Sequence, residues 1–429
     1  MKKRSPKRSP KRSSTIQSSL KFNVKIPFIN YYMEEIIKDN YLYNKYKIEF
    51  NKLFEMQQNM NKCIPSILDI NSSEQIIKTY LNNNDSNNCE QVNCMIHNTL
   101  NTIAQIKTNN VSKYGENLCI PSLLNYNIFQ EIFKPFKIGD GAYGMVFKLS
   151  YYSIPNVFII KVPLKSSIKE QETMHESLIC SYLNRLRTQT NGFSYSFNGF
   201  QCGISNDAKD LCKSKNPRNV SYISIYEYVS DTTFRKFINN TNNIKDIFHI
   251  ILIVLNNLRI AQEDFKFVHC DLHLDNILIR KLQIDKDVTI GNYIFKCKYE
   301  PVIIDFGMST ITITEDNIET DLNRGSYVYN QKLYLKTFDI YRLISDLVHI
   351  VDRKRDKNSN RFFKYESDLL SYFWNNTSTL ELKKKLENDR NRTTQYSNFY
   401  KDYSMMKTFS LGSIEDYITI LTNFIKNKF

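Results

Sequence analysis

The sequence predicts an α+β fold with two lobes, a small β-rich lobe followed by a larger helical one. Short runs rich in β-branched and aromatic residues come first, and long stretches with helical apolar spacing come later, which indicates segregated strands and helices. A content of 41% hydrophobic and 13% aromatic residues over 429 residues excludes wholesale disorder. The predicted strands are Phe133–Ile138, Met145–Tyr151, Val157–Val162 and Tyr222–Tyr228. The predicted helices are Glu170–Arg187, Ile244–Phe265, Phe338–Val351, Glu366–Phe373 and Ile414–Ile425.

We expect four segments along the chain. Residues 1–20 form a disordered basic tail, 21–125 a mostly helical extension without a recognisable chemical motif, 126–229 the small lobe and 230–429 the helical lobe. Seven Lys and Arg residues and no acid occur within residues 1–14, so this segment supplies half of the net charge of +14. The tail is a candidate contact for a polyanion or a nuclear import receptor, with a merely solvated tail as the alternative.

Composition also limits the compartment. Nine cysteines scattered along the chain predict reduced thiols rather than a disulfide framework. Cys89, Cys94 and His97 have the spacing of half a zinc site, but no second ligand pair follows. The longest apolar run, Ile250–Leu255, is far shorter than the ~20 residues of a membrane span, and no signal peptide is visible. We therefore expect a soluble intracellular monomer without a membrane partner.

A glycine-rich string, G-x-G-x-x-G-x-V, follows the first predicted strand. Strand-like residues flank it on both sides, so it is expected to cap a hairpin rather than to open a helix. Glycines in such a hairpin let backbone amides approach phosphate oxygens. Its residues are Gly139, Asp140, Gly141, Ala142, Tyr143, Gly144, Met145 and Val146.

A lysine lies within the third predicted strand. Lys161 is flanked by apolar residues and therefore needs an anionic partner. Glu172 and Glu176 lie on one face of the following helix, and either could pair with it. We prefer Glu176, because apolar residues continue an inward face after it, and we expect Glu172 to be exposed.

Two further motifs follow the long apolar helix. The first is an H-x-D-x4-N string with His269, Asp271 and Asn276, and the second is a strand that ends in Asp305-Phe306-Gly307. Each acid alone could be an ordinary loop residue. The ordered set of glycine loop, lysine, Asp/Asn loop and strand-terminal Asp is explained by phosphoryl transfer, which needs metal ions, a cation, loop amides and a carboxylate.

On these motifs the chain, from Phe133 to near its end, resembles the eukaryotic protein kinases. The resemblance implies an enzyme that uses ATP and Mg²⁺, or Mn²⁺, to phosphorylate Ser or Thr hydroxyls of a protein substrate. It implies catalytic roles for Asp271, Lys161, Glu176 and His273, and metal binding by Asn276 and Asp305. Nucleotide binding is implied for Ile138, Gly139, Gly141, Ala142, Tyr143, Gly144, Val146, Lys161, Glu227, Val229 and Leu278, with Tyr226 at the gatekeeper position.

The departures from the family pattern are informative. Cys270 replaces the Arg that binds an activation-loop phosphate, and His273 stands where a Lys is usual, so a pH-dependent His273 cation is expected near the γ-phosphate. No Ala-Pro-Glu is present, about 20 extra residues (Lys281–Glu300) precede the Asp-Phe-Gly strand, and Asp339 matches the helix acid that braces the catalytic loop. These features are similar to the haspin-type branch, although haspins usually carry Asp-Tyr-Thr. The Asn-rich composition suits a large DNA virus, which would place the protein in the host cytoplasm, the nucleus or the virion.

Two other functions remain open from the sequence. Aminoglycoside and choline kinase-like enzymes also use an H-x-D-L-H-x-x-N loop, so a small-molecule phosphotransferase is one alternative. A catalytically inactive scaffold with the same fold is the other. Because every residue needed for phosphoryl transfer is present, the protein kinase is the preferred hypothesis.

Overall fold

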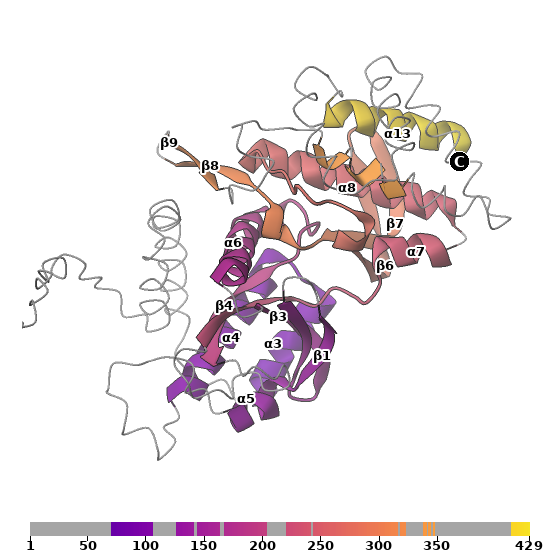
Figure 1. Cartoon of the computed structure of the whole chain (residues 1–429). Coiled ribbons are helices and arrows are strands. Elements are labelled where there is room, and N and C mark those ends of the chain that lie inside the picture. The colour runs from indigo at the N-terminus through magenta and orange to yellow at the C-terminus, as the bar shows by residue number, and fades with distance from the viewer. Residues whose placement is uncertain are drawn as a thin grey trace, which may run out of the picture.

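The computed structural model describes nine parts of the chain, and its mixture of helices and antiparallel strands confirms the α+β class (Figure 1). The basic tail, the predicted helix Glu366–Phe373 and the loop residues Gly141, Ala142 and Tyr143 lie outside the described residues. The described ranges are 70–105, 126–140, 144–163, 167–203, 220–241, 243–315, 318–322, 338–347 without 341 and 345, and 413–429.

One five-stranded antiparallel sheet has the strand order β1-β2-β3-β5-β4. Its strands are β1 (Pro135–Asp140), β2 (Gly144–Tyr151), β3 (Ile154–Pro163), β4 (Ser196–Gly203) and β5 (Val220–Glu227). Four of them correspond to predicted strands. The fourth in the chain, β4, was not predicted from the sequence, because Asn198, Gly199 and Gly203 interrupt its apolar pattern. Antiparallel pairing with β5 stabilises β4 as a strand, although its own sequence pattern predicts a strand only weakly.

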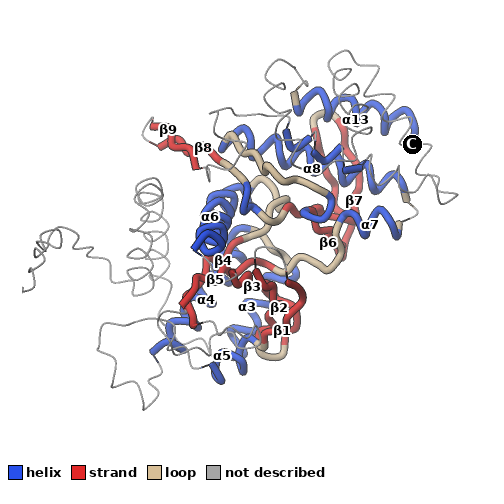
Figure 2. The backbone as a smooth tube through the Cα atoms, in the orientation of Figure 1, coloured by secondary structure: helices blue, strands red, loops and turns tan. Residues whose placement is uncertain are grey.

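Side chains of β5 alternate between two hydrophobic cores, so the sheet is covered on both faces. Tyr222 and Tyr226 pack with helix α6 (Ser167–Leu183) in the larger core. Ile223 and Ile225 face the other way, into the core that contains the residues of the N-terminal extension. Figure 2 shows the sheet lying between α6 and the helices of the extension.

The described part of the extension consists of α3 (Ile70–Asn82) and α4 (Ser86–Gln105), followed by α5 (Tyr126–Phe133). Ile77, Val92 and Ile96 are fully buried and share one core with the sheet. Tyr80 of α3 packs edge-on against Phe197 of β4, with the ring centroids 5.9 Å apart. Residues 70–105 are therefore an integral layer of the sheet domain.

The helical part is built around α8 (Ile244–Phe265), whose bounds agree with the sequence prediction. Asn243 caps its first turn through a bond from the Lys245 N–H, and Lys266 ends it in the left-handed conformation. The predicted insert before Asp-Phe-Gly forms most of a long hairpin of β6 (Ile277–Ile290) and β7 (Tyr293–Ile303). The remaining elements are α7 (Phe234–Asn240), β8 (Ile311–Glu315), β9 (Ile318–Leu322) and α13 (Ile414–Lys428).

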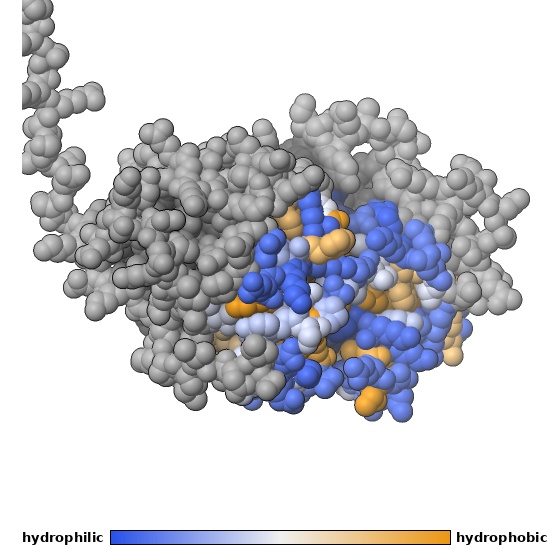
Figure 3. All heavy atoms as spheres, turned by 90° about the horizontal axis from the view of Figure 1, so that it is seen from below, coloured by the Kyte–Doolittle hydropathy of each residue, from blue (hydrophilic) through white to orange (hydrophobic). Residues whose placement is uncertain are grey.

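Few large apolar side chains are exposed among the described residues, and one face of the molecule is shown in Figure 3. On that face hydrophobic spots are separated by hydrophilic residues rather than joined into one patch. Within the described ranges, no helix has the length and apolar character needed to cross a membrane.

Candidate active site

The glycine string lies at the turn of a hairpin, as the sequence predicted. Strands β1 and β2 are antiparallel and pair Gly139 with Val146 and Asp140 with Met145. A Cβ on Gly144 would lie 2.2 Å from the Val162 carbonyl oxygen, so only glycine fits there against β3. A Cβ on Gly139 would meet nothing within 4 Å. Gly144 is thus required for packing of the two strands, whereas the space beside Gly139 is open.

Lys161 connects three elements beneath this hairpin. Its Nζ lies 2.5 Å from Glu176 Oε1 on α6 and 3.1 Å from Oδ1 of Asp305, which follows the end of β7. Burial alone would lower the pKa of Lys161, but the carboxylates of Asp305 and Glu176 raise it above its ordinary value. The nearby Lys161 cation lowers the pKa of Asp305 in turn. Lys161 is therefore a charged ammonium, and its predicted ion pair with Glu176 is present.

One pocket collects most of the predicted chemistry. Its lining includes the glycine hairpin, Lys161 and the acids from the two later motifs. The full lining is Gly144, Met145, Val146, Lys161, Val162, Glu172, Thr173, Glu176, Asp271, Asp305, Gly307 and Met308. The expectation that Glu172 is exposed is wrong, since its exposed fraction is 8% and it lines this pocket. Helix α6 runs along the pocket, and its residues Glu172 and Glu176 both line it.

The residues with an implied role in nucleotide binding do not all line this pocket. Val146 lines it, whereas Ile138, Val229 and Leu278 do not. Glu227 follows Tyr226 and points to the opposite face of the sheet, where its carboxylate is fully buried. Only the backbone of Glu227 is therefore placed to bind a nucleotide on the cleft side.

The loop from His269 to Asn276, which is expected to be the catalytic loop, is held by one buried acid, as predicted for Asp339. Its two carboxylate oxygens accept the N–H groups of His269 and Cys270, at 2.7 and 3.0 Å. Cys270 is a non-glycine residue with a φ of +66°, a strained conformation that these two bonds stabilise. His269 Nε2 lies 2.9 Å from the Ile304 carbonyl oxygen and so links the loop to the Asp-Phe-Gly segment.

Asp271 and Asn276 face each other across the loop. The Asn276 amide donates from Nδ2 to the Asp271 carbonyl at 2.9 Å, and its own backbone carbonyl accepts the Ile304 N–H. Asp305, in the left-handed region with a φ of +69°, follows directly after Ile304. Asp305, which is distant in the sequence from Asp271 and Asn276, is thereby brought to the site that they form.

The donors fit a hard divalent cation. The Asn276 amide nitrogen donates a hydrogen bond to the Asp271 carbonyl, so the amide oxygen is left to bind a cation. Asp305 contributes a carboxylate on a side chain that is 40% exposed. Mg²⁺ typically takes one or two such protein oxygens and completes its shell with phosphates and water. In the described residues no group of three or more His, Cys, Asp or Glu residues could hold a metal alone. The arrangement accordingly suits a cation that arrives with a phosphate.

His273 is the residue that the sequence suggested as a cation. Its Nδ1 accepts the Asp275 N–H at 3.2 Å, and burial lowers the pKa of His273 below its ordinary 6.5 despite the nearby carboxylates. Both observations favour a neutral imidazole. A lowered pKa moves the protonation of His273 to a lower pH than usual, and the expected His273 cation near the γ-phosphate stays a prediction.

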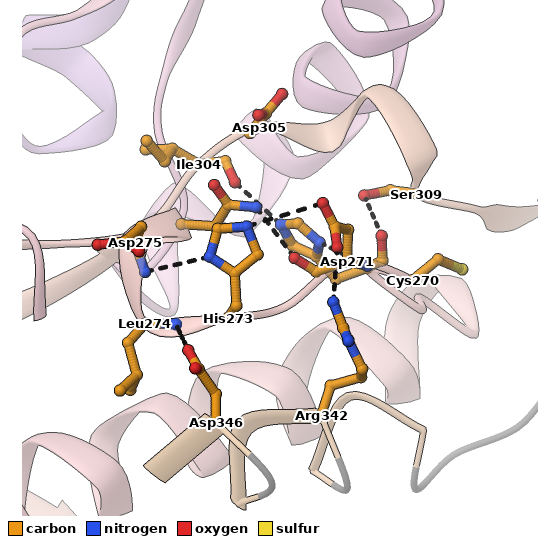
Figure 4. A network of polar contacts seen from close by, with 12 residues as sticks. Cys270, Asp271, His273, Leu274, Asp275, Ile304, Asp305, Ser309, Arg342 and Asp346 are labelled. Carbon is orange, nitrogen blue, oxygen red and sulfur yellow. Dashed lines mark hydrogen bonds and ion pairs between the residues drawn. The ribbon is translucent and has the colours of Figure 1, made fainter. Parts of the chain in front are cut away.

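The sequence analysis missed two charged residues at the site, Arg342 and Asp346. Arg342 donates to Asp271 Oδ1 at 2.9 Å, and Asp346 accepts the Leu274 N–H at 2.8 Å (Figure 4). Both carboxylate oxygens of Asp346 also accept from Nη2 of Arg235, which in turn pairs with Asp275 through Nε. Their positions in the sequence could have revealed them. Arg342 and Asp346 follow Asp339 by three and seven residues, a spacing that places all three on one helix face.

The half zinc site is not supported by the described residues. Cys89 is fully buried, donates its thiol to the Asn84 carbonyl and has a pKa raised to about 12 by burial. Cys94, the second cysteine of the motif, is disulfide-bonded, so it cannot supply the thiolate that a zinc ion needs, and it departs from the expected reduced thiols. Cys89 is therefore a structural thiol in the core beneath α4.

Comparison with known proteins points to kinases. No family model matches the chain. It is 27% identical over 234 residues to "Probable kinase 098L" of Invertebrate iridescent virus 3, covering 52% of this chain and 39% of that protein. It is 26% identical over 247 residues to "Serine/threonine-protein kinase haspin homolog" of Drosophila melanogaster, covering 48% of this chain and 43% of that protein. A third relative, "Uncharacterized protein 179R" of Invertebrate iridescent virus 6, is 23% identical over 260 residues, 55% of this chain and 21% of that protein.

These similarities confirm the predicted resemblance to kinases, including a haspin homologue and a protein of a large DNA virus. The chain spans less than half the length of each of these relatives. At this level of identity the similarities support a kinase in general. They do not identify the molecule that accepts the phosphate.

Proposed function

We propose that the protein is a kinase that transfers the γ-phosphate of ATP to Ser or Thr hydroxyls of a protein substrate. The observation that carries this proposal is the position of Lys161, which lies between Glu176 and Asp305 in a pocket that also contains Asp271. A nucleotide triphosphate brings negative charge that a fixed ammonium can hold, and Asp271 lies where an acceptor hydroxyl could approach.

Each residue then has a distinct task. Lys161, oriented by Glu176, binds the phosphates that precede the transferred group, and the glycine hairpin covers them with backbone amides. Asn276 and Asp305 hold Mg²⁺, which neutralises charge on the phosphates when bound. Asp271 orients the acceptor hydroxyl and takes its proton as the phosphate is transferred. The chemistry therefore depends on positioning and charge rather than on a covalent intermediate.

The proposal is tested by incubating the protein with Mg²⁺ and γ-labelled ATP, together with histone, casein and small alcohols such as choline and an aminoglycoside. We expect label on Ser or Thr of protein. Lys161→Met and Asp271→Asn should each reduce transfer by at least about 100-fold while the far-UV circular dichroism is unchanged. Lys286→Met, at an exposed lysine of the β6–β7 hairpin, is the matched control and should retain full activity.

The outcomes separate the alternatives. Label on a small alcohol without label on protein would favour the small-molecule phosphotransferase. A folded wild-type protein that binds no Mg-ATP would favour the inactive scaffold. Label on Tyr alone would keep the kinase and overturn the Ser/Thr specificity.

A further inference from the structure

The described helical residues 338–340, 342–344 and 346–347 contact the catalytic loop at three points along one face. Asp339, Arg342 and Asp346 are separated by three and four residues, so they lie above one another on this helix. Asp339 and Asp346 accept backbone N–H groups of the loop, and Arg342 donates to the Asp271 side chain. The same helix face therefore fixes both the backbone of the loop and its carboxylate.

Arg342 supplies a charge that the loop itself lacks. In the described part of the chain, Asp271 forms ion pairs with Arg342 at 2.9 Å and with His273 at 3.8 Å. The contact of His273 with the carboxylate is the longer of the two, so Arg342 is the closer cationic partner of Asp271. A guanidinium also stays charged at every pH at which the protein is folded.

The two sides of the ion pair differ in exposure. The Arg342 side chain is 13% exposed and the Asp271 side chain is 35% exposed. Arg342 approaches Oδ1 from beneath the loop, as Figure 4 shows, and Asp271 also lines the pocket. The guanidinium thus holds one carboxylate oxygen from the protein interior, which leaves the carboxylate open toward the pocket.

We infer that Arg342 is a positioning residue for phosphate transfer: its guanidinium fixes the Asp271 carboxylate in the orientation that receives the acceptor hydroxyl. This inference rests on the proposed function. From its position on the helix, Arg342 supplies a fixed positive charge. In the family pattern, a lysine two residues after the catalytic aspartate would supply such a charge. It does not line the ATP-side pocket, so its removal should slow the transfer step without weakening nucleotide binding.

The test compares kcat and KM for ATP in the wild type, Arg342→Ala and Arg342→Lys. We expect Arg342→Ala to lower kcat about 30- to 100-fold with KM for ATP within about twofold of the wild type. Added methylguanidinium should restore kcat in a saturable way, because it refills the space left by the side chain. Arg342→Lys keeps the charge but loses the planar fork, so kcat should fall about 5- to 10-fold. Arg259→Ala, which breaks the exposed pair with Glu263 on α8, is the control and should keep the kcat of the wild type with or without methylguanidinium.

Four outcomes decide the inference. A wild-type kcat in folded Arg342→Lys would overturn it, as would an Arg342→Ala variant that shows mainly a raised KM and no response to methylguanidinium. If Arg342→Ala does not fold, a drop in kcat of Arg342→Lys at wild-type Tm supports the positioning role. A wild-type protein that transfers no phosphate would overturn the proposed function and this inference with it. If the wild type is active but the variants do not behave as expected, only the role of Arg342 is overturned.

Discussion

Replacing Glu227 by Gln should destabilise the protein by about 3 kcal/mol, because it removes the negative charge from a buried ionic network. The Glu227 side chain is 0% exposed and accepts from Arg187 and Arg280, each at 2.6 Å. It also accepts the Tyr195 N–H at 2.8 Å and lies 3.5 Å from the Tyr80 hydroxyl. Gln keeps the size of the side chain but leaves Arg187, which is 2% exposed, without its counter-charge.

The magnitude follows from two arguments that agree. Breaking a buried ion pair by removing one partner typically costs about 3–5 kcal/mol. Burial alone would raise the pKa of Glu227, but Arg187 and Arg280 lower it from 4.5 to about 2. A depressed carboxylate pKa contributes stability above pH 4.5 that is lost as the pH falls toward 2, and this difference corresponds to about 3 kcal/mol.

The measurement is urea denaturation at pH 7, monitored by circular dichroism, for wild type and Glu227→Gln. Glu263→Gln is the matched control, since its carboxylate pairs with Arg259 at 2.7 Å but is 55% exposed, and it should change the free energy of unfolding by less than about 0.5 kcal/mol. The two ion pairs differ mainly in burial. If both substitutions lower the free energy of unfolding by the same small amount, the argument that burial of the Glu227 charge determines its contribution is refuted.

Three further predictions concern single residues. His249 is buried and stacks on Phe295, and burial lowers its pKa to about 4. The free energy of unfolding should therefore fall by up to about 3 kcal/mol as the pH drops from 6.5 to 4, and this loss should be absent in His249→Phe. Ile96→Ala in α4 should cost about 2–4 kcal/mol in urea denaturation, whereas Leu81→Ala, at a side chain 43% exposed, should cost less than about 0.5 kcal/mol. Asp339→Asn replaces one of two oxygens that accept loop N–H groups, so kcat should fall at least about 10-fold; unchanged kcat would contradict a bracing role for Asp339.

The elements with strong local patterns were predicted well from the sequence. Helix α8 has a continuous apolar face and an Asn243 cap, and four of the five sheet strands are rich in β-branched and aromatic residues. The Lys161–Glu176 pair and the Asp339 brace were also predicted, because their motifs occur in order along the chain. Strand β4 was missed because its formation depends on pairing with β5 rather than on its own residues.

The remaining features depend on distant contacts that no local pattern contains. Arg342 meets Asp271 across 71 residues of sequence, and Arg187 meets Glu227 across 40. The face of β5 that carries Glu227 depends on register, since a shift of one residue would turn its side chain toward the cleft. The lowered pKa of His273 likewise follows from burial, which the residue type does not determine.

Coverage of the sheet on both faces also determines how short a working fragment of this chain can be. A fragment starting at residue 126 would retain every residue with a proposed chemical role, yet it would uncover the side of the sheet that holds Ile223, Ile225 and Glu227. Water would then reach an apolar surface and a buried ion pair together, which favours aggregation in expression hosts. The shortest segment able to fold is therefore longer than the shortest segment that contains the chemistry, and deletions made for crystallisation should keep α3 and α4.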